Sequence, residues 1–152
     1  MRLGPYKKFH CMNLLSRILL RPPRLFGLPL GQAGEEWVCY LYRQRGFEVV
    51  ARNYTIFGPR KLGEIDIICR QDGRLVLVEV KTRSSEQFMD IFEAVDRRKQ
   101  AYLRRMAKLF LQKNAEYAEF PVQIDVAAVL LDPFDNSVQS VKLLENAVED
   151  TD

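Results

Sequence analysis

The strongest constraint on this chain is the Asp72-Gly73 pair, which separates two runs of strand-forming residues at 64–70 and 75–82. Asp-Gly favours a type I′ turn, because that turn needs a positive φ at both of its central residues. Turns of this kind join neighbouring antiparallel strands, so the pair predicts a β-hairpin. A turn of known length also fixes the register of the two strands that it joins.

The predicted register places four charged side chains on one face of the hairpin, because side chains alternate along a strand. Asp66 lies opposite Glu79, and Glu64 lies opposite Lys81. The other face is expected to be core, and it collects Ile65, Ile67, Val78 and Val80. The alternative interpretation is a solvated face on which Glu64 and Lys81 form an ordinary ion pair.

The opposed carboxylates of Asp66 and Glu79 favour a metal site. Their Cβ atoms are expected about 5 Å apart, where two negative charges repel each other. A divalent cation reverses that repulsion, and carboxylate oxygens are the ligands that Mg²⁺ prefers. Lys81 adds a positive charge that can stabilise a phosphate or help to deprotonate metal-bound water. Since isolated acids within apolar runs are costly unless paired or metal-bound, the set predicts metal-assisted hydrolysis of phosphodiesters.

The rest of the chain predicts a mixed sheet with helices against it. Apolar periodicity and branched residues predict helices at 32–45 and 91–114 and strands at 47–51, 122–131 and 137–144. Gly58-Pro59 predicts a loop or ragged hairpin end at 54–62. The order αβββαβ(β) defines an α/β fold class. One domain is expected at 31–146, after a basic extension at 1–30 and before an acidic, frayed end at 147–152.

Composition excludes several classes of protein. The single histidine, His10, lies in the basic extension, so neither a histidine triad nor a histidine-rich metal site is expected. The three cysteines lie far apart and form no CxxC pair, which favours free thiols in a reducing cytoplasm. No apolar run approaches the ~18 residues of a membrane span. The formal net charge of +3 combines a basic N-terminal part with an acidic C-terminal part. Only the local distribution of charge therefore indicates which partners the protein binds.

Several motifs in this order resemble a known family. Asp66 with Glu79-Val80-Lys81 is similar to the PD-(D/E)XK nuclease pattern. The wider pattern, over about residues 31–131, resembles the YraN-type family of bacterial proteins. That family is related by fold to restriction endonucleases and archaeal Holliday junction resolvases. The motifs are Gly34-Glu35, Arg52-Asn53, Gly63-Glu64-Ile65-Asp66, Val78-Glu79-Val80-Lys81, Glu93-Ala94-Val95 with Lys99, and Asp125-Val126.

The resemblance implies a restriction-endonuclease-like core with Mg²⁺ (or Mn²⁺) at Asp66 and Glu79 and with Lys81 as the catalytic lysine. In resolvase relatives a glutamate of the first helix joins the site, and here that residue is Glu35. Those relatives act as dimers, so a homodimer is expected. Gln123-Ile124 departs from the pattern, because Arg-Phe is usual before Asp125.

Four further expectations concern charged residues. Glu64 supports the site. Asp125 is a buried acid paired with an arginine or a backbone amide rather than a catalytic group. Arg83 and Lys99 contact phosphate near the site. The outer face of helix 91–114 is either an ordinary solvated surface or a footprint for duplex DNA; its cations are Arg97, Arg98, Lys99, Arg104, Arg105 and Lys108.

The sequence therefore predicts a cytoplasmic, Mg²⁺-dependent endonuclease-like protein that acts on DNA, including branched or damaged DNA. A non-catalytic nucleic-acid-binding module of the same fold shares every one of these features. A third interpretation is an interaction protein that uses the basic extension at 1–30 to reach a membrane surface or an acidic partner.

Overall fold

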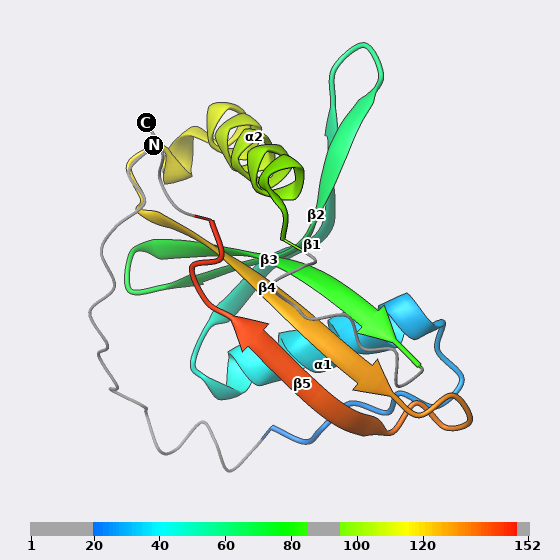
Figure 1. The fold of residues 1–152 in the computed structure, drawn as a ribbon. Helices are drawn as coiled ribbons and strands as arrows, with labels where there is room; N and C mark the ends of the chain where they lie inside the picture. Colours follow the sequence, from blue (N-terminus) through cyan, green and yellow to red (C-terminus); the bar gives the residue numbers. More distant parts are fainter. Residues whose placement is uncertain (1–19, 85–94, 149–152) are drawn as a thin grey trace.

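The fold is a five-stranded mixed sheet with one long helix on each face (Figure 1). The computed structural model describes residues 20–84 and 95–148. The strands lie in the order β1-β2-β3-β4-β5, and only β3 and β4 are parallel. This confirms the predicted α/β class and element order. The elements are α1 (Leu30–Gln44), β1 (Glu48–Phe57), β2 (Lys61–Gln71), β3 (Arg74–Arg83), α2 (Arg97–Lys113), a 3-10 turn (Ala115–Tyr117), β4 (Val122–Leu131) and β5 (Val138–Leu144).

The predicted turn is confirmed. Asp72 and Gly73 have φ angles of 51° and 72°, the positive values that a type I′ turn requires. The paired residues Ile67 and Val78 belong to the predicted register. Because this turn depends on only two adjacent residues, it can be predicted from the sequence without knowledge of long-range contacts.

Of the two alternatives for 54–62, the hairpin end is observed and the loop is wrong, because β1 runs on to Phe57, β2 begins at Lys61 and the pairing is irregular between Ile56 and Phe57. The extended part of β1 is held by its side chains: Ile56 is buried in the core beneath α2, and Tyr54 packs against that core. Gly58 begins the turn, and its N–H donates to the carbonyl of Arg60 over 2.9 Å. The β1–β2 hairpin therefore extends beyond the body of the domain (Figure 1).

Both helices are confirmed, with shifted starts. α1 begins two residues earlier than predicted, after Pro29, whose carbonyl accepts from the N–H of Ala33. α2 begins at Arg97, because the side chain of Asp96 caps it by accepting from the N–H of Lys99 over 2.7 Å. The predicted helical residues 95 and 96 thus precede the helix, and 91–94 lie outside the described residues.

Segments outside the predicted domain also pack on it. Leu25 is buried, and Asn136 donates to the carbonyls of Leu25 and Leu28 over 2.9 Å each. At the other end, the N–H of Ala147 donates to a carbonyl of β4, and Val148 is buried in the core beneath α2. The basic extension is described only from residue 20 onward, and the acidic end only as far as residue 148.

The core consists of one apolar layer on each side of the sheet. One layer lies between the sheet and α2 and includes Leu103, Met106 and Phe110. The other lies between the sheet and α1 and includes Val38 and Tyr42. Cys39 and Cys69 are free and buried. In the part of the chain that is described, no helix is long and apolar enough to cross a membrane.

Candidate functional site

The predicted acids lie where β2 separates from β3. The ladder of paired residues between these strands ends at Ile67 and Val78, one position before Asp66. There the Oδ2 atom of Asp66 accepts from the backbone N–H of Val80 over 2.7 Å, so a side chain replaces the main-chain acceptor. β3 continues beside β4 as far as Arg83, whereas β2 continues with β1 into the hairpin.

The predicted alternation of faces breaks at Asp66. Ile65 was expected beside Ile67 in one core layer, but it lies in the layer beneath α2, and Ile67 lies in the layer beneath α1. The physical reason lies in the neighbouring strand β1. There Arg52 pairs with Ile67 and Tyr54 pairs with Ile65, so Asn53 lies between the two. Its φ of 48° is a left-handed value that interrupts the alternating pleat.

This break overturns the predicted pairing of Glu64 with Lys81. Glu64 accepts instead from Lys61 Nζ over 2.6 Å and from Thr55 Oγ1 over 3.3 Å. The hydrogen bond from Lys61 holds the pKa of the Glu64 carboxyl below its usual range, although burial opposes that effect. Glu64 therefore belongs to the base of the projecting hairpin.

Glu79 is the centre of the site. Its side chain is nearly buried, and its Oε1 atom accepts from Lys81 Nζ over 2.6 Å and from Lys99 Nζ over 2.5 Å. The predicted proximity of Lys81 and Lys99 to the site is thus observed. Lys99 comes from α2, where its ammonium lies 4.8 Å from the centre of the Tyr102 ring. Two cations on one oxygen offset the cost of burying that carboxylate.

The environment of Asp66 disfavours its charged form. Burial, followed by the negative charge of Glu79, raises the pKa of Asp66 to about 6. The charge of Glu35 adds to this effect, whereas the Val80 N–H bond and Lys81 oppose it. Carboxylates crowded at one point are what a bound cation would stabilise.

Glu35 is brought toward this cluster by α1. Its carboxylate accepts from Asn53 Nδ2 over 3.0 Å. The close approach of α1 depends on Gly34, because a Cβ atom there would clash with Thr82 Oγ1 of β3. Asn53 and Gly34 are positioning residues that the sequence analysis did not assign to the site. A glycine within a helix next to a candidate ligand is the signal that could have identified Gly34.

The remaining predicted cations lie on α2 and at the end of β3. Arg97, Arg98 and Arg105 are exposed on the outer face of α2, and Arg104 is half-buried. Arg83 is exposed at the end of β3, where its guanidinium donates to the carbonyl of Thr82 over 3.0 Å. Their positions permit contact with phosphate but do not by themselves assign it.

Asp125 is structural, as predicted. It is 1% exposed and accepts from Tyr42 Oη (2.5 Å), Gln123 Nε2 (2.8 Å) and the N–H of Asn146 (2.8 Å). The expected backbone amide is therefore present. Gln123, which occupies a position where the resembled family usually has arginine, supplies an amide donor as well.

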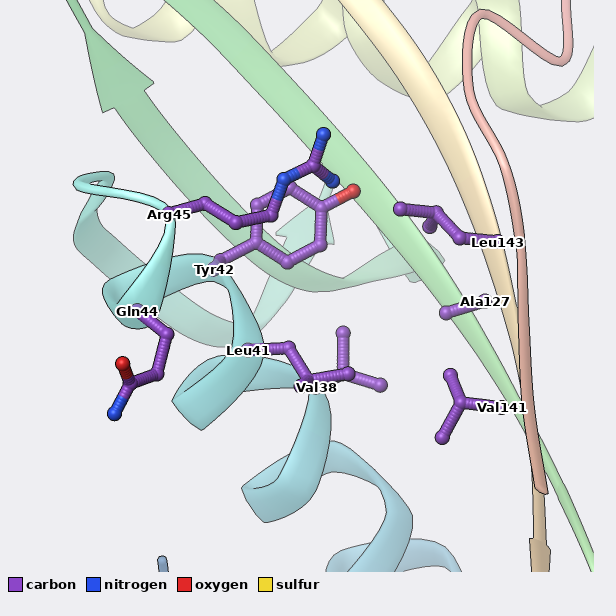
Figure 2. A pocket seen from close by; sticks show the side chains of 8 residues that line it. All are labelled: Val38, Leu41, Tyr42, Gln44, Arg45, Ala127, Val141 and Leu143. Carbon is purple, nitrogen blue, oxygen red and sulfur yellow. The ribbon is translucent and has the colours of Figure 1, made fainter. Parts of the chain in front are cut away.

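A separate apolar pocket of about 240 Å³ lies between α1 and the strands β4 and β5 (Figure 2). Its lining consists of Val38, Leu41, Ala127, Val141 and Leu143 together with Tyr42, Gln44 and Arg45. Apolar walls of this kind suit packing rather than chemistry on a phosphodiester.

Asp66→Asn is expected to stabilise the metal-free protein at neutral pH. The raised pKa means that the folded state disfavours ionised Asp66 above pH 6, and this penalty disappears as the pH falls from 6 toward 4. Asparagine removes the charge but can still accept from the Val80 N–H. In urea unfolding with EDTA, we expect a gain of about 1–2 kcal/mol at pH 7.5 that is largely lost at pH 4.5.

The control is Asp135→Asn. Asp135 is exposed, and hydrogen bonds from Ser137 lower the pKa of its carboxyl, so its replacement should not stabilise the protein. If Asp66→Asn is no more stable than the wild type at pH 7.5, the folded state does not disfavour ionised Asp66, and the prediction is wrong.

The mixed sheet between two helices, with charged groups where its central strands separate, is compatible with a restriction-endonuclease-like α/β protein. Within that class the chain belongs to the uncharacterised protein family UPF0102, whose model matches residues 34–129. This is the YraN family, so the family predicted from the motifs is confirmed.

Relatives match over most of their length. A UPF0102 protein of Desulforamulus reducens is 38% identical over 120 residues, which cover 78% of this chain and 94% of that protein. One from Caldicellulosiruptor saccharolyticus is 37% identical over 122 residues, or 78% and 95% of the two chains. One from Treponema pallidum is 36% identical over 121 residues, or 80% and 93%.

Proposed function

We propose that this protein is a DNA endonuclease that uses Mg²⁺ or Mn²⁺ and acts at Asp66, Glu79 and Lys81. The observation that carries the proposal is the convergence of two carboxylates and an ammonium at the separation of β2 and β3. An ordinary sheet does not need such a cluster, in which burial and then the charge of Glu79 raise the pKa of Asp66.

The donor set suits a hard cation. Mg²⁺ is usually held by one or two carboxylates, and water and substrate phosphate complete its coordination. Asp66 and Glu79 supply two such carboxylates, and Glu35 is a third acid close enough to raise the pKa of Asp66. Among the described residues, no three or more His, Cys, Asp or Glu side chains form a preformed metal cluster, so most of the coordination is left to water and phosphate.

Each residue then has a role in the proposed chemistry. The bound cation would act as a Lewis acid and lower the pKa of a coordinated water. Lys81, beside Glu79, would stabilise the negative charge that develops on the scissile phosphate. Lys99 shares the same carboxylate oxygen and would bind a neighbouring phosphate when Glu79 turns to the cation. Glu35 would orient water.

DNA is the proposed substrate because the exposed cations of α2 lie on the element that reaches the site through Lys99. Lys and Arg on one helix face bind phosphates without regard to sequence, and binding of this kind weakens steeply as salt rises. The proposal includes branched or damaged DNA as the substrate. It also includes a homodimer as the assembly and the cytoplasm as the location.

A non-catalytic DNA-binding module is the second candidate. The observation in its favour is that two ammonium groups already neutralise Glu79 without a metal. The third candidate, an interaction protein that uses the basic extension, depends largely on residues 1–19, which lie outside the described residues.

The test is cleavage of linear, nicked, flapped and four-way DNA with and without Mg²⁺ or Mn²⁺, with Lys81→Ala as the control. Thermal unfolding gives a readout that does not depend on activity. Mg²⁺ at about 100 times its dissociation constant should stabilise the wild type by about 2.7 kcal/mol and should not stabilise Asp66→Asn. Intact DNA across the panel, together with salt-sensitive binding, would favour the binding module.

A further inference from the structure

The β1–β2 hairpin ends in a tip that carries one aromatic ring and two cations. We define the hairpin tip as residues 57–61, Phe-Gly-Pro-Arg-Lys, which contain no acid. All five residues are exposed, and 60% of the surface of Phe57 is accessible to solvent. The β1–β2 hairpin projects away from the rest of the sheet, and its tip lies at the far end of this projection (Figure 1).

The hairpin is held rigidly at its base. A Cβ atom at Gly63 would clash with Met106 Sδ and lie 2.7 Å from Tyr102 Oη, so glycine allows α2 to pack directly against β2. The Tyr102 hydroxyl also donates to the carbonyl of Glu64 and accepts from its N–H, over 3.3 Å and 3.2 Å. The direction of the hairpin is therefore fixed relative to α2 and to the site.

The distance from the tip to the site corresponds to a few nucleotides. Lys61 and Asp66 are five residues apart on β2, which spans about 17 Å at ~3.3 Å per residue. A strand within a DNA duplex covers that distance in about five nucleotides at ~3.4 Å each. Phe57 is paired with Lys61 across the hairpin, and Lys61 is ion-paired with Glu64, so Arg60 is the exposed cation of the tip that a nucleic-acid backbone would meet.

We propose that Phe57 stacks on an unpaired base of forked or flapped DNA, about five nucleotides from the phosphodiester held at Asp66 and Glu79. This inference rests on the proposed nuclease function and deepens it by naming the junction between duplex and single strand as the substrate class. A single exposed apolar residue is ordinary on a protein surface. Here the ring lies at the end of a rigid hairpin among cations, the setting in which aromatic residues stack on single-stranded bases.

The test measures binding of a forked DNA and of a blunt duplex, both in EDTA so that no cleavage occurs. The fork carries 2-aminopurine at its unpaired positions, and the fluorescence of this base changes when it stacks. Phe57→Ala is expected to weaken binding of the fork about tenfold and to leave the duplex unchanged. Phe57→Trp should retain both the affinity and the fluorescence change.

Phe134→Ala is the matched control, because Phe134 is 90% exposed in the turn between β4 and β5. Equal effects of Phe57→Ala and Phe134→Ala, or an equal loss of fork and duplex binding in Phe57→Ala, would overturn the stacking role. Cleavage that is unaffected by Phe57→Ala on every substrate would leave the nuclease proposal intact and remove only this inference. A wild type that binds neither DNA would overturn both.

Discussion

Glu79→Gln is expected to reduce Mg²⁺-dependent DNA cleavage by about 10³-fold or more. Glutamine keeps the shape of the side chain and removes the negative charge that both the proposed cation and the two lysines require. Steady-state cleavage of whichever DNA the wild type cuts best measures the effect. Lys81→Ala should give a loss of similar size, because Lys81 contacts the Glu79 carboxylate and would stabilise the negative charge on the scissile phosphate.

DNA binding should change in the opposite direction. In the wild type Glu79 holds the ammonium groups of Lys81 and Lys99, and glutamine would release both from their counter-charge. In EDTA, Glu79→Gln is therefore expected to bind DNA at least as tightly as the wild type, with a steeper dependence on salt. This combination separates a catalytic role from a merely structural one.

Glu64→Gln is the control for charge, because Glu64 contacts Lys61 and Thr55 rather than the lysines of the site. Its cleavage rate should stay within about tenfold of the wild type, as for a group that acts indirectly. A Glu79→Gln protein that cleaves DNA at the wild-type rate would contradict the proposed site.

The sequence predicts the central hairpin and its register well because both depend on local chemistry. Asp72 and Gly73 adopt the positive φ angles that a type I′ turn requires, and the register of five residue pairs follows from the turn. The two acids and Lys81 could therefore be placed close together before any long-range contact was known.

The sequence could not predict where the pleat breaks. The positive φ of Asn53 moves Ile65 to the other core layer and turns Glu64 toward Lys61. Asparagine tolerates this conformation, but only the packing of the hairpin against α2 makes it necessary here.

The sequence also does not predict how side chains from the two helices reach the site. Lys99 was predicted near the site, but its direct contact with Glu79 depends on how α2 lies over β3, which the sequence does not give. The position of Glu35 likewise depends on how closely α1 approaches Thr82 at Gly34. Only the resemblance to resolvases suggested that a glutamate of the first helix belongs to the site.

Asp125→Ala is expected to destabilise the protein by about 3–5 kcal/mol, because three donors, two of them buried, lose their acceptor together. These donors are the Tyr42 hydroxyl, the Gln123 amide and the N–H of Asn146. A loss of this size is a large fraction of the total stability of a small domain. Urea unfolding at pH 7.5 measures it, and Asp135→Ala, an exposed acid, should change the stability little.

Tyr42→Phe tests the same network from the helix. It removes one donor and leaves Asp125 with the other two, so a smaller loss of about 1–2 kcal/mol is expected. In the double variant, Tyr42→Phe should cost much less than it does alone, because its acceptor is already absent. Additive losses would mean that the 2.5 Å contact between these side chains contributes little.

Asp125→Asn distinguishes a structural acid from a catalytic one. Burial raises the pKa of Asp125, so the folded state penalises its ionised form, and this penalty on the stability of the wild type should be relieved as the pH falls through that raised pKa toward the ordinary value. Asparagine carries no charge and can still accept from Gln123 and Asn146, so Asp125→Asn should fold and should lose this pH dependence. Its Mg²⁺-dependent cleavage should equal that of the wild type, because Asp125 bonds to Tyr42, Gln123 and Asn146 rather than to the site at Asp66 and Glu79. A folded Asp125→Asn protein without activity would instead place this carboxylate in the chemistry, and would require the proposed site to extend along β4.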